Sequence, residues 1–224
     1  MSLTVKEIEK KYAITFEDEY VENYNDDVIN IFNGNLEEYL NSQDDKILNL
    51  LGIYYKNVKR NYELAIKYLK MAVELGNSYS MYNLGIYYYN IEKNYELAIE
   101  FLKKAIELGN YNAMSNLGAY YYEVEKNYEL AIKYYLMAIE LGNYSAMSNL
   151  GAYYYKVEKN YELAIKYFKM AVELGNSGAM NNLGAYYFTV EKNNELAIKY
   201  IKMAVELGNS SAMKNLEHFK SGYW

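Results

Sequence analysis

The feature that most constrains this chain is a 33-residue sequence repeat. One copy of it runs from Asn160 to Lys192. Related copies begin at Asn61, Asn94, Asn127 and Asn193. A fixed period of this length is typical of solenoids, in which each repeat buries its apolar face only against its neighbours. Such an array grows by adding repeats, so its length does not indicate how many separate cores it holds.

Each repeat predicts two helices, which we call helix A and helix B. In one copy we expect helix A over Ser145–Val157 and helix B over Tyr161–Leu174, with Asn160 as the N-cap of helix B and Gly175 at its end. The apolar side of helix A follows the helical spacing i, i+3, i+4 and i+7: Met147, Leu150, Gly151 and Tyr154. The glycine on this stripe should let helix B approach closely. Because the chain contains no proline, we expect Gly or Asn to make every turn.

The short A–B connection makes the two helices antiparallel neighbours, so the sequence predicts an all-α fold, an α-solenoid of helix pairs. With Asp44 as the first N-cap, the expected pairs and final half repeat cover about residues 45–75, 79–108, 112–141, 145–174, 178–207 and 211–220. Met213, Leu216 and Phe219 of the half repeat should cover the last helix B. Residues 221–224 form a short tail.

Residues 1–44 lie outside the repeats and carry most of the acidity. They hold eleven acidic residues and three lysines, a net charge of −8, which leaves +2 for the rest of a chain whose total is −6. We expect them to form an acidic, helical N-terminal cap of the array, because a solenoid needs an end with a polar outer face. An alternative is a regulatory role, in which Glu17–Asp27 competes with an acidic partner for the array.

Composition argues against catalysis. The chain has no cysteine and a single histidine, His218, so a nucleophile–base device would rest wholly on this residue of the terminal half repeat, and a His/Cys metal site is excluded by count. Acidic residues such as Glu158 and Glu162 are read as solvated charges at helix ends. The sequence therefore predicts a protein that is not an enzyme and that binds no cofactor or metal.

Location is indicated only indirectly. No uncharged run of about 18 apolar residues and no signal-like N-terminus is found, so we expect a soluble, intracellular, cytoplasmic protein without membrane contact. Abundant Lys, Asn, Ile and Tyr with one arginine indicate an AT-rich genome, such as that of a parasite, an endosymbiont or a large DNA virus. A viral origin would imply the host cytoplasm.

The repeat resembles a known family. Its signature positions match the spacing of tetratricopeptide repeats: Met147, Leu150, Gly151, Tyr154, Ala164, Phe168 and Ala171. The run from Lys169 to Tyr187 is similar to the Sel-one-like subfamily, with its Lys-x-Ala, Gly, Ala, Leu-Gly and Tyr pattern, and the resemblance covers residues 45–220. It departs in lacking a longer A–B loop and in having asparagine where proline often ends helix B: Asn77, Asn110, Asn143, Asn176 and Asn209.

The resemblance implies a superhelix whose helices A line a groove for a protein or peptide. The face of helix A opposite helix B would line it and carries Ser145, Asn149, Ala152 and Lys156 in the fourth repeat. Its recurring asparagines, here called the Asn ladder, are Asn83, Asn116, Asn149, Asn182 and Asn215. An amide can both donate to and accept from a peptide unit, so the ladder predicts binding of an extended backbone. The alternative is that these side chains contact the neighbouring repeat.

Two further sets of positions are candidates for the same groove. In each aromatic triplet the register puts the middle residue in the core and the third at the groove edge, where it could stack on a ligand: Tyr89, Tyr122, Tyr155 and Phe188. Positions that differ between otherwise similar copies are candidate specificity residues: Asn90, Glu123, Lys156, Thr189, Tyr79 and Asn112. Sequence drift is the alternative for the second set.

The leading interpretation is a non-enzymatic scaffold or adaptor that binds an extended peptide or a protein in the groove. The alternative is a structural subunit of a larger assembly or homo-oligomer, joined through the convex helix B face or through ends that contain Phe219 and Trp224. The tyrosines raise single-stranded RNA as a third possibility. Nucleic acid is not the expected partner, because the array has one arginine and no basic stripe. The partner's identity and the oligomeric state stay open.

Overall fold

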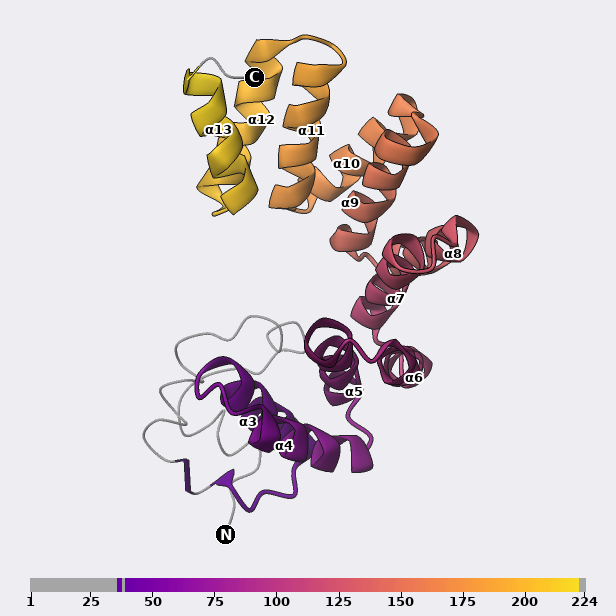
Figure 1. The fold of residues 1–224 in the computed structure, drawn as a ribbon, viewed down its shortest axis with the longest axis vertical. Coiled ribbons are helices and arrows are strands. Elements are labelled where there is room, and N and C mark those ends of the chain that lie inside the picture. The colour runs from indigo at the N-terminus through magenta and orange to yellow at the C-terminus, as the bar shows by residue number, and fades with distance from the viewer. Residues whose placement is uncertain (1–35, 38, 222–224) are drawn as a thin grey trace. The chain divides into compact units, whose positions relative to one another are not determined.

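The computed structural model describes residues 36–37 and 39–221 (Figure 1). Within them the secondary structure is entirely helical, with no strand. The predicted helices before residue 36, the acidic segment Glu17–Asp27 and Trp224 lie outside the described residues. The all-α solenoid prediction is confirmed for the part of the chain that is described.

Helices A and B alternate along the chain. The helix A elements are α3 (Asp45–Asn57), α5 (Ser78–Tyr87), α7 (Tyr111–Glu123), α9 (Tyr144–Tyr153), α11 (Ser177–Thr189) and α13 (Ser210–Ser221). The helix B elements are α4 (Tyr62–Glu74), α6 (Tyr95–Glu107), α8 (Tyr128–Glu140), α10 (Tyr161–Glu173) and α12 (Asn194–Glu206). A π-helical turn continues α5 and α9: η2 (Tyr88–Glu92) and η3 (Tyr154–Glu158). Each pair begins and ends within one residue of the range predicted from the repeat.

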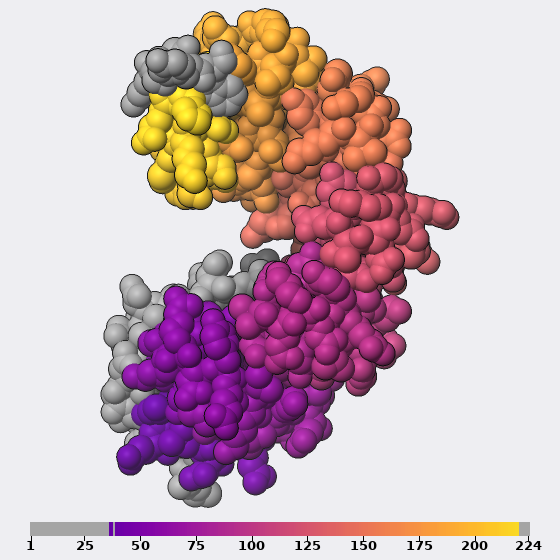
Figure 2. Space-filling model, viewed as in Figure 1, coloured from indigo at the N-terminus to yellow at the C-terminus, as the bar shows by residue number. Residues whose placement is uncertain are grey.

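The chain forms two compact units that divide after Ala113, inside α7. Unit 1 contains α3 to α6, and unit 2 contains the rest of α7 and all helices through α13. Within each unit the helices follow one another in chain order, as the colours show on the surface in Figure 2. Each unit is described by itself below.

Every helix B ends in a left-handed glycine, as predicted, and the asparagine after it has a double role. After α10, Gly175 has φ 81°, and the Asn176 N–H donates to the Ala171 carbonyl at 2.9 Å. This pattern is a Schellman motif. The Asn176 side chain then caps α11 by accepting from the Ala179 N–H at 2.7 Å. Proline has no N–H and no side-chain acceptor, so it could fill neither role.

The A–B turns correct the prediction that Gly or Asn makes every turn. The left-handed residue there is basic in every repeat, with φ between 54° and 56°: Arg60, Lys93, Lys126, Lys159 and Lys192. This conformation costs a non-glycine residue roughly 1–2 kcal/mol. The following asparagine caps helix B, as when Asn160 accepts from the Leu163 N–H at 3.1 Å, and this bond offsets part of the cost.

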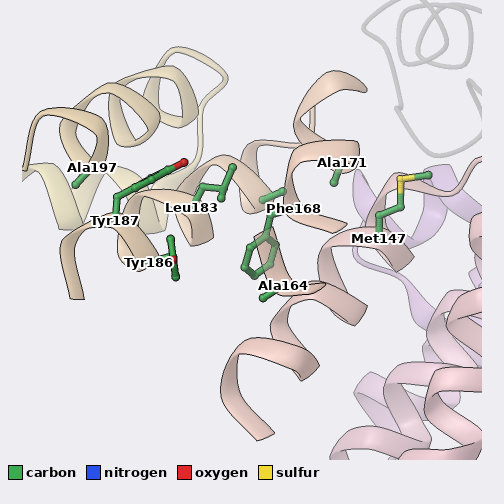
Figure 3. Close-up of a cluster of buried hydrophobic side chains, with 9 residues drawn as sticks. Met147, Ala164, Phe168, Ala171, Leu183, Tyr186, Tyr187 and Ala197 are labelled. Carbon is green, nitrogen blue, oxygen red and sulfur yellow. The ribbon is translucent and has the colours of Figure 1, made fainter. Parts of the chain in front are cut away.

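Close packing within a repeat depends on the helix A glycine, as predicted. A Cβ built on Gly151 would lie 2.7 Å from Cδ1 of Phe168 and 3.2 Å from the carbonyl oxygen of Ala164. Phe168 and Ala164 are fully buried and belong to one core cluster with Ala171 and Leu183, which Figure 3 shows. Only a residue without a side chain permits this approach of α9 to α10.

The helices A of neighbouring repeats also touch each other. In unit 1 α3 contacts α5, and in unit 2 α9 contacts α11. Among the described residues, α10 and α12 show no comparable approach. Helices A therefore form the inner layer of each unit and helices B the outer layer.

The final half repeat covers α12 less completely than predicted. Leu216 and Phe219 pack against the cluster that contains Ile201 and Ala204. Met213, however, is 42% exposed, so its predicted part in this cover is wrong. The α13 helix has no further helix B beside it among the described residues, which leaves Met213 on the outside.

Candidate peptide-binding face

The face of helix A that the spacing predicts to be open lies at the surface of unit 2. We call the following residues of α9, of η3 after it and of α11 the open face: Ser145, Asn149, Ala152, Lys156, Gly178, Asn182, Ala185 and Thr189. All are exposed or half-buried, whereas Leu150 and Gly151 on the other side of α9 are buried. Because α9 contacts α11, equivalent side chains of the two helices form one continuous surface.

Two members of the Asn ladder are occupied by bonds between repeats. Nδ2 of Asn83 in α5 donates to Oδ1 of Asn49 in α3 at 3.1 Å. Nδ2 of Asn215 in α13 donates to Oδ1 of Asn181 in α11 at 2.8 Å. Asn49 is 2% exposed and also accepts from Oγ of Ser80 at 2.9 Å. For Asn83 and Asn215 the structure thus favours the alternative reading, a contact with the neighbouring repeat.

The central members of the ladder differ. Asn149 is exposed and Asn182 is half-buried, and neither side chain makes a hydrogen bond to any residue that the structure describes. Asn116 lies in α7 close to the unit boundary and takes part in other interactions. The two amides that are available to a ligand therefore belong to α9 and α11.

The third aromatic residues pack against other rings rather than standing as open stacking surfaces. The Tyr155 ring lies 5.8 Å from that of Tyr161 and 6.4 Å from that of Tyr186 in the next repeat. Its hydroxyl is 2.8 Å from Oγ1 of Thr189. Equivalent ring contacts are Tyr89–Tyr95 at 5.6 Å, Tyr122–Tyr128 at 5.8 Å and Phe188–Phe219 at 4.8 Å. Tyr155 and Phe188 thus join neighbouring repeats beside the open face.

The candidate specificity residues fall into two groups. Asn90, Glu123 and Lys156 are exposed. Thr189 is exposed too, but its hydroxyl donates to the Ala185 carbonyl at 2.7 Å, so part of its hydrogen-bonding capacity is used. Two half-buried positions take part in other interactions: Tyr79 and Asn112.

The predicted register of the aromatic triplets is confirmed only in part. The middle residues Tyr88 and Tyr187 are buried, with 6% and 8% exposure, as predicted. In unit 2, however, the first residue is buried as well, and more deeply than the middle one: Tyr120, Tyr153 and Tyr186, with 4%, 4% and 6% exposure. Tyr154, a middle residue, is half-buried and stacks on Tyr167 of helix B at 5.7 Å. Tyr153 also meets the repeat before it, through Tyr128 at 5.5 Å. Spacing within one helix pair could not show this second contact.

These buried phenols give the A–B turn a role that the sequence did not show. Tyr153 donates to Glu158 and Tyr186 to Glu191, the second at 2.9 Å. Glu158 is thus not the purely solvated charge that was expected. Burial, followed by the hydrogen bond to the carboxylate, raises the pKa of Tyr153 and of Tyr186 to about 12.

We expect the protein to lose stability as the pH rises from about 10 to about 12. Unfolded tyrosine ionises near pH 10, whereas Tyr153 and Tyr186 keep their protons in the folded state to about pH 12. Above pH 10 the unfolded chain therefore binds fewer protons, and the free energy of unfolding falls; below pH 10 this contribution is constant. Urea unfolding across this range measures the slope. A Tyr153→Phe/Tyr186→Phe variant with an equally steep slope would refute the assignment.

We also searched residues 36–37 and 39–221 for a metal site and for a membrane-spanning helix. No group of three His, Cys, Asp or Glu side chains in this part of the chain could hold a metal ion. His218 is exposed on α13 and takes part in interactions there. No helix of the described chain is long and apolar enough to cross a membrane.

Comparisons with known proteins agree with the geometry. A family model described as Sel1 repeat matches five consecutive segments: residues 48–77, 78–110, 112–143, 145–176 and 177–209. No curated protein matches the chain by sequence.

Solved structures share the fold. One is c5321, a protective antigen of uropathogenic Escherichia coli that displays an SLR fold, at 27% identity and TM-score 0.67 over 84% of this chain; the match spans only 44% of c5321. Another is a Sel1 repeat protein from Oxalobacter formigenes, at 24% identity and TM-score 0.68, covering 85% of this chain and 87% of that one. Immunity protein Pa5087 from Pseudomonas aeruginosa is similar at 23% identity and TM-score 0.59, over 83% and 75% of the two chains.

Proposed function

Because the chain belongs to the Sel1 repeat family, we propose that it is a non-enzymatic scaffold that binds an extended peptide segment of a protein partner on the open face of α9 and α11. Helical repeat scaffolds of this kind generally mediate contacts between proteins. One observation carries the proposal: Asn149 and Asn182 present side-chain amides on this face, and neither amide is hydrogen-bonded to the described chain.

The chemistry of the face suits a peptide backbone. Each asparagine amide can donate to a backbone carbonyl and accept from a backbone N–H. One turn further along each helix, the small side chains of Ala152 and Ala185 let a backbone come close. Lys156 is exposed at the end of the same face and favours a segment that carries an acidic side chain there. The amides hold the backbone, and the neighbouring positions supply selectivity.

The test is a peptide-display selection on the wild-type protein, followed by calorimetry with an enriched peptide. We expect Asn149→Ala/Asn182→Ala to weaken binding more than tenfold. Each net hydrogen bond contributes about 0.5–1.5 kcal/mol, and an amide that both donates and accepts makes two. The loss of two amides then costs about 2–6 kcal/mol, more than the roughly 1.4 kcal/mol of a tenfold change in affinity.

Asn194→Ala is the matched control, because Asn194 is exposed at the start of α12 in the helix B layer. It should leave the affinity unchanged. Equal affinity of the double variant and the wild type would remove the open face from consideration. A loss of helicity in the double variant would show instead that these amides have a structural role.

A further inference from the structure

We propose that one residue per repeat decides whether a ladder asparagine bonds to its neighbour or stays available to a ligand. This residue, here called the lock position, lies 34 residues before the ladder asparagine, one helix A earlier. The pairs of lock position and ladder asparagine that lie within one unit are Asn49 with Asn83, Ser115 with Asn149, Ser148 with Asn182, and Asn181 with Asn215. The inference deepens the proposed function and rests on it.

Where the lock position is asparagine, the ladder amide is closed, meaning that it is hydrogen-bonded to the lock residue. The bonds from Asn83 to Asn49 and from Asn215 to Asn181 have the same atoms, Nδ2 to Oδ1, and lengths of 3.1 and 2.8 Å. One lies in unit 1 and the other in unit 2, so the geometry recurs independently. A ligand that recruited such an amide would first have to break this bond.

Where the lock position is serine, the ladder amide is open, meaning that it is not hydrogen-bonded to the lock residue. Ser115 and Ser148 are buried, with 4% and 7% exposure, as Asn49 is at the same repeat position with 2%. A serine hydroxyl oxygen stands one covalent bond nearer the backbone than an asparagine Oδ1. Neither serine bonds to its ladder asparagine, and Asn149 remains exposed.

The packing of the helices does not explain the difference between open and closed amides. A Cβ on Gly85 in α5, whose Asn83 is bonded, would lie 3.3 Å from a helix B carbonyl oxygen, and a Cβ on Gly151 or Gly184, in the two helices with unbonded ladder amides, 3.2 or 3.1 Å, so helix A sits at the same depth on its helix B in both cases. The residues that follow these ladder asparagines are fully buried in the closed and the open repeats alike: Leu84, Leu150 and Leu183. The lock position is therefore the difference that matters.

This assignment limits the ligand. Two open amides stand one repeat apart on α9 and α11, and the next ladder residue, Asn215, is closed. The site fits a short extended segment of a protein, held through its backbone at two points. Backbone contacts do not read side chains, so selectivity for the segment comes from exposed neighbours such as Lys156.

The experiment converts the two serines into locks. In Ser115→Asn/Ser148→Asn both ladder asparagines are retained, yet each gains the acceptor that Asn181 offers to Asn215. We expect this variant to bind a peptide selected on the wild type more than tenfold more weakly, as in Asn149→Ala/Asn182→Ala. Its helicity by circular dichroism should equal that of the wild type. Ser210→Asn is the control, since Ser210 is exposed at the start of α13, and its affinity should match the wild type.

The outcomes separate this inference from the proposed function. Wild-type affinity in Ser115→Asn/Ser148→Asn, combined with a loss in Asn149→Ala/Asn182→Ala, would overturn the lock alone. Selection of no peptide by the wild type would overturn both.

The reverse variant Asn181→Ser tests the lock independently, in case Ser115→Asn/Ser148→Asn does not fold. It should shift the side-chain amide signals of Asn215 in a ¹⁵N NMR spectrum, because the 2.8 Å bond is removed. Unchanged signals would contradict the lock even if no other variant folded.

Discussion

Phe168→Ala is expected to lower the free energy of unfolding of unit 2 by about 3–5 kcal/mol. The side chain is fully buried, and its ring fills the space that Gly151 leaves between α9 and α10. The backbones cannot close the cavity, because the Ala164 carbonyl oxygen already lies 3.2 Å from the Cβ position of Gly151. Urea unfolding followed by circular dichroism measures the loss.

Phe168→Leu is the matched control and should cost only about 1 kcal/mol. Leucine already occupies the equivalent place in unit 1, where Leu69 and Leu102 are each 1% exposed. Similar losses for the alanine and leucine variants would show that the aromatic ring, and not the filled volume, stabilises the repeat.

The same substitution should act locally, because each repeat of a solenoid contacts only its neighbours. Hydrogen exchange in Phe168→Ala should lose protection in α9, α10 and α11 and retain it in α3 and α4. Peptide binding should fall with it, since α9 and α11 carry Asn149 and Asn182. Equal loss of protection in both units would contradict a solenoid whose repeats are stabilised by their neighbours.

Short-range rules explain why most of the fold could be predicted from the sequence. The Asn160 cap, the left-handed Gly175 and the apolar spacing of Met147 and Leu150 each act within one or two helical turns. The 33-residue period multiplies such signals, so an error in one copy is corrected by the others. The helix ends are accordingly accurate to one residue.

The wrong predictions concern residues whose burial or conformation depends on groups outside their own helix. Tyr153 is buried because it meets its own helix pair and also Tyr128 of the repeat before, which a helical wheel for one repeat does not contain. Lys159 takes a left-handed conformation that its own propensity does not favour, because the N-cap of the next helix fixes the turn. At Tyr153 a tertiary contact overrules the local pattern, and at Lys159 the adjacent Asn160 cap overrules the residue's own preference for negative φ.

The candidate site shows the same division. The Asn ladder could be predicted because asparagine recurs on one face of helix A. The sequence repeat did not show that these five amides differ in whether they bond to the neighbouring repeat. The signal that separates them was present in the sequence as the unlike residues at the lock position, asparagine at Asn49 and Asn181 and serine at Ser115 and Ser148. Its meaning depends on which residue of the preceding helix A faces the ladder, and the hydrogen bond from Asn215 to Asn181 supplies that information.

Gly184→Leu is expected to destabilise unit 2 by about 3 kcal/mol, although leucine is a better helix former than glycine. A Cβ at Gly184 would lie 2.6 Å from Cγ1 of Ile201 and 3.1 Å from the Ala197 carbonyl oxygen. A side chain could be admitted only if α12 moved away from α11, which would open the core around Ile201. Chemical denaturation of the purified variant gives the difference directly.

Gly178→Leu in the same helix should have the opposite sign. Gly178 is half-buried at the start of α11, and the nearest atoms to its Cβ position are Oδ1 of Asn176 at 3.2 Å and Oγ of Ser148 at 3.9 Å. Other repeats place Tyr79 or Ser145 at this point beside the same asparagine cap, so the backbone accepts a side chain. The gain in helix propensity should then raise stability by up to about 1 kcal/mol. If both variants were more stable, helix propensity alone, and not the closeness of α11 to α12, would govern these glycines; if both were less stable, the backbone at Gly178 would not accept a side chain.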